Sequence, residues 1–161
     1  MTRTIIIRGP LGCGKTTIAK RVAAGLRGRY ISVDTLLEKR GLDTVEGECI
    51  PERNFLEVNA DIIREVEKAA GLGKSVVIDG CFYHKRVVEE LVGKTGAVVF
   101  TLKAPVGTCV ERDTRRDGLG EEATRHVYKL VSRFDYGTTM DATRPVEETV
   151  ENILSAVRKG S

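Results

Sequence analysis

Residues 9–16 read GPLGCGKT and match the pattern G-x-x-x-x-G-K-[ST]. An apolar β-branched run at residues 5–7 precedes this stretch, and an amphipathic helical pattern beginning near Ile18 follows it. A strand, a glycine-rich turn and a helix in this order are typical of a loop that holds phosphate groups. The alternative is a chance glycine-rich turn before a capped helix. It does not explain why a strand pattern precedes the turn and a helical pattern follows it. The sequence therefore predicts a nucleoside triphosphate site in residues 9–17.

Each residue type in this phosphate loop suits the binding of phosphate. Glycines let successive backbone N–H groups curl around phosphate oxygens. Lys15 stands at the start of the predicted helix, where its ammonium can reach the β- and γ-phosphates and the helix dipole favours an anion. The Thr16 hydroxyl is a suitable ligand for Mg²⁺. The predicted ATP-binding residues of this loop are Gly9, Gly12, Cys13, Gly14, Lys15, Thr16 and Thr17.

The composition indicates one globular domain over residues 1–161. Hydrophobic residues make up 41% and charged residues 30% of the chain, and no apolar run approaches the roughly 18 residues of a membrane span. The four cysteines form no C-x-x-C pair, which favours reduced thiols over zinc or disulfides. No signal peptide is recognisable at the start of the chain. We therefore expect a cytoplasmic location without a membrane partner, and the net charge of +3 does not by itself indicate nucleic acid.

Short apolar runs alternate with helical patterns along the chain. Strands are predicted at residues 5–7, 30–33, 75–78, 97–102 and 138–140. Runs that are apolar throughout, separated by helices, indicate a parallel sheet covered on both faces. The expected fold class is α/β, a three-layer P-loop NTPase fold with a five-stranded parallel sheet and a short lid. Ligands of such sheets bind beyond the carboxyl ends of the strands, so residues at those ends are candidates for the site.

Asp79 closes the third apolar run and is a candidate for the Mg²⁺ site, directly or through a water. The alternative is a solvated aspartate that opens an Asp-Gly turn. The next residue is Gly80, where ATPase motors commonly carry a glutamate that activates water, and the chain has no guanine-reading Asn-Lys-x-Asp. A bound hydroxyl is therefore a more natural phosphate acceptor than water.

Asp34 follows the second apolar run and is the best candidate for a general base. A carboxylate at the end of that strand lies near the phosphate loop in this architecture, where it can accept a proton from a hydroxyl during γ-phosphoryl transfer. The other interpretation is an N-cap for the helical segment that begins at Thr35, and the two roles are compatible.

Three arginines lie in the run RDTRRDG at residues 112–118. Phosphoryl transfer needs cations near the oxygens that gain charge and a loop that excludes water. Arg112 and Arg116 are one helical turn apart and are the preferred catalytic pair, and the charged residues 114–122 are the predicted lid. A solvated helix face that ends at a turn explains the same run equally well.

Five stretches together resemble the small P-loop kinases, a group that includes adenylylsulfate kinase, chloramphenicol phosphotransferase and the polynucleotide 5′-kinase domain. They are GPLGCGKTT, ISVDTLLE, VVIDGCF, TLKAPVGTCVERDTRRD and DATRPVEETVENI. ISVDTLLE is closest to the segment with the base of the chloramphenicol enzyme, so the resemblance implies that role for Asp34. It also implies an adenine pocket lined by Thr143, Arg144 and Pro145, for which a loop before a proline-started helix is the alternative.

These observations predict an ATP-dependent kinase that uses Mg²⁺ and phosphorylates a hydroxyl of a small molecule, nucleotide-like acceptors included. The second interpretation is a polynucleotide 5′-hydroxyl kinase, but aromatic residues for base stacking are only 5% of the chain. The third is a regulatory ATPase that transfers phosphate to water, which Gly80 and the missing guanine motif disfavour. The sequence leaves the acceptor and the oligomeric state open.

Overall fold

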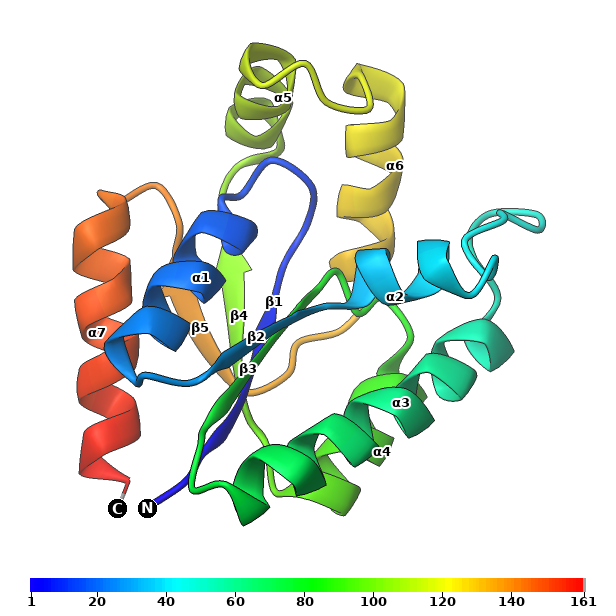
Figure 1. Ribbon diagram of the computed structural model, residues 1–161. Helices are drawn as coiled ribbons and strands as arrows, with labels where there is room; N and C mark the ends of the chain where they lie inside the picture. The colour runs from blue at the N-terminus through cyan, green and yellow to red at the C-terminus, as the bar shows by residue number, and fades with distance from the viewer. Residues whose placement is uncertain (161) are drawn as a thin grey trace.

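The computed structural model describes residues 1–160 and has an α/β fold in three layers (Figure 1). Its strands are β1 (Thr4–Arg8), β2 (Arg29–Ser32), β3 (Val76–Gly80), β4 (Val98–Lys103) and β5 (Thr138–Asp141). Within the described residues all five strands are parallel and form one sheet in the order β2-β3-β1-β4-β5. The predicted five-stranded parallel sheet is confirmed.

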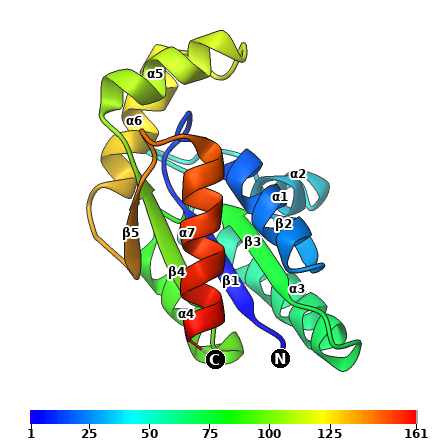
Figure 2. The same ribbon diagram turned by 90° about the vertical axis from the view of Figure 1, so that its left-hand side faces the viewer.

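Helices cover both faces of this sheet (Figure 2). They are α1 (Lys15–Gly25), α2 (Val33–Lys39), α3 (Glu52–Gly71), α4 (Lys85–Thr95), α5 (Val106–Arg115), α6 (Glu121–Val131) and α7 (Val146–Lys159). Helices α1 and α7 pack side by side on one face, and α3 and α4 pack side by side on the other. Helix α5 stands beyond the carboxyl ends of the strands in both views.

The central strand β1 shows why its run is apolar throughout. Ile5 and Ile7 belong to the core cluster formed with α1 and α7, whereas Ile6 between them belongs to the cluster formed with α3 and α4. All three are fully buried because successive side chains of a strand point to opposite faces of the sheet. Burial of each such side chain contributes about 1.5–3 kcal/mol to folding. The predicted three-layer arrangement is confirmed.

The second strand ends earlier than the apolar pattern predicts. Strand β2 stops at Ser32, and Val33 already belongs to α2. Ser32 Oγ accepts a hydrogen bond from the Thr35 N–H at 3.3 Å, so Ser32 is the N-cap. The expectations that Asp34 ends the strand or caps the helix are therefore wrong. Asp34 lies in the first turn of α2, where a carboxylate interacts favourably with the helix dipole.

Arg8 is a fully buried charge at the carboxyl end of β1, directly before the phosphate loop. Its Nε donates to the Phe82 carbonyl at 3.0 Å, and its Nη1 donates to Thr101 Oγ1 at 3.3 Å. Its Nη2 donates to the carbonyls of Val131 and Phe134 at 2.7 and 3.1 Å. Burial lowers the pKa of Arg8 to about 10, so the side chain stays charged at neutral pH. One side chain thus joins the central strand to segments far away in the sequence.

Replacing this arginine tests how much stability the contacts provide. We expect Arg8→Ala to lower the free energy of unfolding by about 3 kcal/mol or more, because three carbonyl oxygens lose their donor. Urea unfolding followed by circular dichroism measures the change. The control is Arg21→Ala, which removes an exposed ion pair with Glu147 and should cost less than about 1 kcal/mol. Equal stability of the two variants would contradict the role assigned to Arg8.

Candidate functional site

The phosphate loop joins β1 to α1 and packs against α5. Gly12 and Gly14 adopt the left-handed backbone region, with φ of 77° and 88°. A Cβ at Gly12 would lie 2.1 Å from the Cys109 carbonyl oxygen, so only glycine fits there. Gly14 is the N-cap of α1 and has no side chain to accept from the first N–H groups of the helix. These N–H groups and the positive end of the helix dipole remain for an anion.

Lys15, the first residue of α1, is a buried cation with 7% of its surface exposed. Its ammonium forms no hydrogen bond or ion pair with another side chain in residues 1–160. Burial by itself lowers the pKa of Lys15, but neighbouring groups hold that pKa above its ordinary value. These groups are Cys81, Cys13, Asp79 and Asp34. Burial raises the pKa of both thiols, so Cys13 and Cys81 carry no charge at neutral pH. Lys15 is therefore available to neutralise phosphate oxygens.

Asp79 lies inside β3 and accepts two hydrogen bonds on one oxygen, Oδ2. The Thr16 hydroxyl donates from 2.9 Å and the Tyr30 hydroxyl donates from 2.6 Å. The register of the sheet aligns Asp79 with Ser32 of β2 and Ile7 of β1. The structure thus brings Thr16 and Asp79 together and adds Tyr30, which the sequence analysis did not consider.

Thr16 and Asp79 have the donor chemistry that Mg²⁺ uses at a nucleotide. Mg²⁺ is commonly held by one or two protein oxygens together with phosphate oxygens and water. Within residues 1–160 no group of three or more His, Cys, Asp and Glu side chains could hold a metal ion alone. Thr16 and Asp79 therefore fit an ion that arrives with the nucleotide, and such an ion would neutralise charge on the phosphates.

Asp34 is an exposed carboxylate on the first turn of α2. It forms no hydrogen bond or ion pair with the side chains of residues 1–160. Desolvation by the surrounding protein raises the pKa of Asp34 above its ordinary value. Lys15 opposes this rise, Asp79 adds to it, and Arg116 opposes it. Asp34 is thus an exposed carboxylate whose charge interacts with those of Lys15, Asp79 and Arg116.

Arg112 and Arg116 are held by different partners. Arg112 Nη1 donates to the Ala142 carbonyl at 2.7 Å and lies 3.5 Å from the Cys13 carbonyl. Arg112 therefore fixes α5 to the phosphate loop and to the segment after β5. Arg116 forms an ion pair with Asp113 at 3.2 Å, and its positive charge lowers the pKa of Asp34. The structure does not join the two guanidiniums, and only Arg116 lies on the side of the predicted base.

Thr143, Arg144 and Pro145 lie in the turn between β5 and α7. Asp141 Oδ1 accepts from the N–H and the hydroxyl of Thr143 at 2.9 and 2.6 Å. Arg144 pairs with Glu148 at 3.4 Å, and Pro145 is the N-cap of α7. A groove of about 450 Å³ reaches this turn at Asp141, and its lining residues are Lys103, Ala104, Pro105, Tyr128, Thr139 and Asp141. The adenine-binding role of the turn stays a prediction, because its three residues lie beside the groove.

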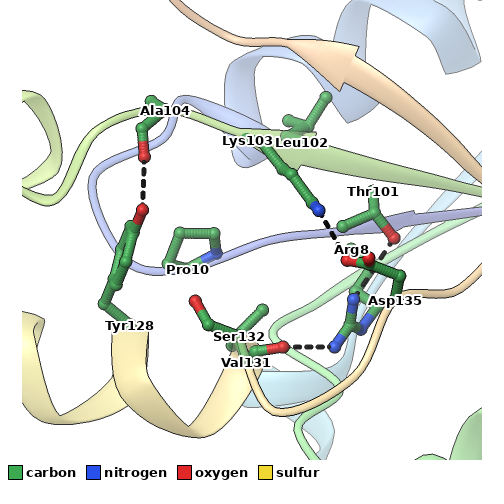
Figure 3. A pocket seen from close by; sticks show the side chains of 10 residues that line it. All are labelled: Arg8, Pro10, Thr101, Leu102, Lys103, Ala104, Tyr128, Val131, Ser132 and Asp135. Atoms are coloured by element: carbon green, nitrogen blue, oxygen red, sulfur yellow. Dashed lines mark hydrogen bonds and ion pairs between the residues drawn. The ribbon is translucent and has the colours of Figure 1, made fainter.

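A smaller cavity of about 140 Å³ lies behind the phosphate loop, with Pro10 on its wall (Figure 3). Two pairs of its polar groups are bonded to each other. Lys103 forms an ion pair with Asp135 at 2.5 Å, and the Tyr128 hydroxyl donates to the Ala104 carbonyl at 3.0 Å. The predicted catalytic residues do not line this cavity, which therefore contributes to the frame of the site.

The predicted lid, residues 114–122, comprises the end of α5, a short connection and the start of α6. Every residue in it is exposed. Asp113 immediately before it is buried, and its carboxylate accepts from the Gly120 N–H at 3.0 Å. A Cβ at Gly118 would lie 2.1 Å from Asp113 Oδ1, so the connection wraps closely around this carboxylate. Sequence reasoning missed Asp113 because it lies in the polar run RDTRRDG, in which every residue from Thr114 to Gly118 is exposed.

Comparison with known proteins places this geometry in a family. The family model described as an AAA domain matches residues 5–128, which contain the phosphate loop, Asp34, Asp79 and both arginines. The chain belongs to this family. Shikimate kinase of Francisella tularensis subsp. novicida is 31% identical over 136 residues, which are 78% of this chain and 73% of that protein.

Two further relatives extend the comparison of this AAA-domain chain. Cytidylate kinase of Sulfurisphaera tokodaii is 38% identical over 79 residues, which cover 47% of this chain and 43% of that protein. A solved sugar kinase structure from Janibacter sp. HTCC2649 has a TM-score of 0.82 at 19% identity and covers 96% of this chain and 94% of its own. This similarity to the sugar kinase structure shows the fold of the chain.

This AAA-domain chain is an ATP-dependent kinase of the small P-loop group. The predicted resemblance to that group is confirmed at this level. The finer resemblance to adenylylsulfate kinase, chloramphenicol phosphotransferase and polynucleotide kinase stays a prediction. No helix within residues 1–160 is long and apolar enough to cross a bilayer.

Lys15 is the residue on which nucleotide binding should depend most. We expect Lys15→Ala to abolish phosphoryl transfer and to weaken binding of ATP with Mg²⁺, because no other residue places a charge inside the loop. Calorimetry with ATP and a turnover assay measure both effects. The control is Lys94→Ala, an exposed lysine in the last turn of α4. Wild-type affinity and turnover in Lys15→Ala would show that residues 9–17 are not the phosphate loop.

The exposed lid should open more easily than the sheet. Residues 114–122 contribute no buried side chain, so local opening there should cost little free energy. We expect fast amide hydrogen exchange in this segment without ligand, and slower exchange once ATP and the acceptor are bound. Exchange in strand β3 of the same sample is the internal control. Exchange of residues 114–122 as slow as that of β3 without ligand would argue against a lid.

Proposed function

We propose that this kinase transfers the γ-phosphoryl group of Mg²⁺-bound ATP to a hydroxyl of a small molecule, with Asp34 as general base. The unpaired carboxylate of Asp34, close enough to Lys15 for their charges to interact, is the observation that carries the proposal. As the acceptor oxygen bonds to phosphorus, its proton passes to Asp34 and the bond to ADP breaks. ADP is the leaving group.

The other site residues take complementary roles in this proposal. Lys15 supplies positive charge for the phosphoryl oxygens. Arg116 adds its charge on the side of Asp34 while it stays paired with Asp113, and Arg112 holds α5 against the phosphate loop. Thr16 and Asp79 hold the Mg²⁺ ion when the nucleotide brings it. The nucleotide contacts proposed in addition are Gly9, Gly12, Cys13, Gly14, Thr17 and, around the adenine, Thr143, Arg144 and Pro145.

Gly80 supports a hydroxyl acceptor over water. A Cβ at this position would lie 2.8 Å from a ring carbon of Phe82 and 3.0 Å from a methyl group of Val33. A glutamate that activates water therefore does not fit there, which argues against a regulatory ATPase. The names of the relatives, shikimate kinase and cytidylate kinase among them, support a small acceptor over a polynucleotide end.

Asp34→Asn tests the base directly. The substitution keeps the volume of the side chain and leaves the cap at Ser32 intact, so fold and ATP affinity should stay close to wild type. We expect phosphoryl transfer to fall by about 10²–10⁴-fold, the usual range for a general base. The pKa of Asp34 is raised, and only the ionised form accepts a proton. The acid limb of kcat/KM should therefore lie above the ordinary aspartate pKa of about 3.9 and disappear in the variant.

Two matched variants complete this test. Glu38→Gln changes an exposed carboxylate on the same helix and should leave transfer unchanged. Asp79→Asn should mainly raise the Mg²⁺ concentration needed for activity, because it alters the metal site. Normal transfer by Asp34→Asn to its acceptor would overturn the base assignment. An equal loss of transfer and of background ATP hydrolysis would instead point to a role in nucleotide positioning.

A further inference from the structure

The segment that connects α2 to α3 is fastened to residues that follow β3. The Ile50 N–H donates to the Tyr83 hydroxyl oxygen at 3.2 Å, and the Ile50 carbonyl lies 2.8 Å from His84 Nε2. The rings of Phe55, Tyr83 and His84 pack edge to face, with centroids 4.9 to 5.4 Å apart. Because α2 carries Asp34, this aromatic group and the connecting segment belong to the acceptor side of the site.

Tyr83 has a hydroxyl proton without an acceptor. Burial raises the pKa of Tyr83, and the neighbouring Cys49, Cys81 and Asp34 raise it further, so the phenol stays protonated. Its oxygen accepts from Ile50, and the proton is donated to no atom of residues 1–160. A half-buried phenol near the proposed base, with its donor unused, is suited to bind an oxygen of the acceptor.

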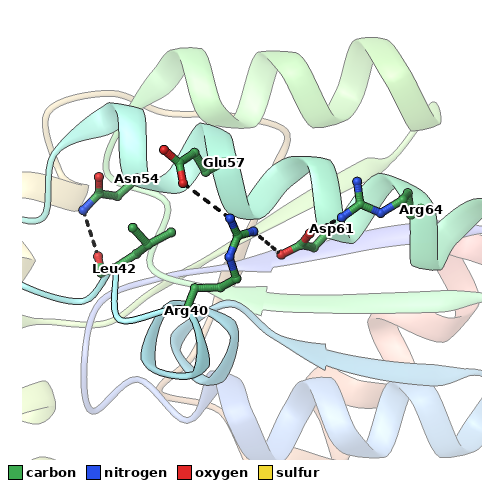
Figure 4. Close-up of polar contacts among 6 residues, drawn as sticks. All are labelled: Arg40, Leu42, Asn54, Glu57, Asp61 and Arg64. Atoms are coloured by element: carbon green, nitrogen blue, oxygen red, sulfur yellow. Dashed lines mark hydrogen bonds and ion pairs between the residues drawn. The ribbon is translucent and has the colours of Figure 1, made fainter.

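The arginines around the acceptor side already form ion pairs with carboxylates. Arg40 lies between Glu57 and Asp61, and Arg64 contacts the same Asp61 (Figure 4). Figure 4 also shows Asn54 donating to the Leu42 carbonyl, which fixes the start of the connecting segment to α3.

The other arginines between Arg53 and Arg133 are also paired, apart from Arg112. The further ion pairs are Arg53 with Glu46, Arg86 with Glu52, Arg133 with Glu48, Arg115 with Glu111, Arg116 with Asp113 and Arg125 with Glu121. Within the described chain, every arginine from Arg40 to Arg133 is thus ion-paired, except Arg112, which is bonded to carbonyl oxygens.

These pairings bear on the charge of the acceptor. Carboxylate and phosphate groups are preferentially bound by a guanidinium fork, and an acidic acceptor would have to break an existing pair to obtain one. Lys39 and Lys85 on this side are exposed, and an exposed ammonium is a strongly hydrated point charge without a fork. Asp34 adds an unpaired negative charge that repels an anion.

We infer, on the basis of the proposed function, that the acceptor is an uncharged polyhydroxy compound with one hydroxyl at Asp34 and a second hydroxyl that accepts a hydrogen bond from Tyr83. Tyr83 is then a specificity-determining residue. The Ile50 N–H orients the phenol oxygen, so the O–H is directed to the ligand rather than to the connecting segment.

The first experiment compares acceptors with and without an anionic group. The pairs are shikimate and its methyl ester, gluconate and sorbitol, and cytidine 5′-monophosphate and cytidine. The kcat/KM from ADP release, with the phosphorylated product identified by mass spectrometry, should favour the neutral member at least tenfold. Preference for the charged members would overturn the inference and leave the proposed function standing. Absence of a phosphorylated product from every pair would count against the proposed function, and the inference would fall with it.

The second experiment tests Tyr83 with the best neutral acceptor. Tyr83→Phe should lower kcat/KM for that acceptor about tenfold, mostly through KM, because one hydrogen bond to a neutral group is lost. The KM for ATP should not change. Tyr136→Phe, at another half-buried tyrosine, is the control.

A deoxy analogue separates recognition from a structural effect. Tyr83→Phe also removes the acceptor of the Ile50 N–H, and a displaced segment would impair all acceptors alike. We expect the wild type and Tyr83→Phe to have equal kcat/KM with an analogue that lacks the second hydroxyl, the one assigned to Tyr83. An unchanged tenfold difference on the analogue, or no difference on the parent acceptor, would overturn the assignment of Tyr83.

Discussion

A buried guanidinium holds the sheet, the phosphate loop and the end of α6 in one arrangement. Burial of an unpaired charge costs several kcal/mol, and Arg8 offsets this cost with oxygen acceptors from four other residues. The ring of Phe134 lies 4.1 Å from its guanidinium carbon and adds a cation–π contact. Because Arg8 directly precedes Gly9, the same contacts fix where the phosphate loop begins. The loop and the helix that follows the lid therefore share one anchor.

The lid side of the site depends on a second set of close approaches. Gly12 packs against the Cys109 carbonyl, and Arg112 donates to the Cys13 carbonyl of the phosphate loop and to the Ala142 carbonyl after β5. These contacts keep α5 on the phosphate loop as far as Asp113, where burial ends and the exposed segment 114–122 begins. The boundary of the predicted lid thus coincides with the last buried residue of α5.

The two halves of the site are built differently. The nucleotide half is a continuous loop and helix start, supplemented by Asp79 from the neighbouring strand. The proposed acceptor half is assembled from α2, the segment before α3 and the residues after β3, joined through Ile50 to Tyr83 and His84. Phosphate binding needs the same backbone geometry for every acceptor, whereas the acceptor half must match one molecule. The kinases similar to this chain accordingly carry different substrate names.

The sequence by itself determined the features that arise within one short stretch. The glycines and Lys15 of the phosphate loop predicted an anion site because the loop binds through its own backbone, and the runs at residues 5–7 and 75–78 predicted strands buried on both faces. Tertiary structure decided what depends on partners distant in sequence: the Tyr30 and Thr16 hydroxyls on Asp79, the Gly120 N–H on buried Asp113, and the Ile50 N–H on Tyr83. The wrong expectation for Asp34 has the same cause. Strand β2 ends at Ser32, where its pairing with β3 ends, and the Ser32 hydroxyl is then the N-cap of α2. A pattern of apolar residues predicts which side chains are buried. It does not predict which polar groups come into contact when the strands align.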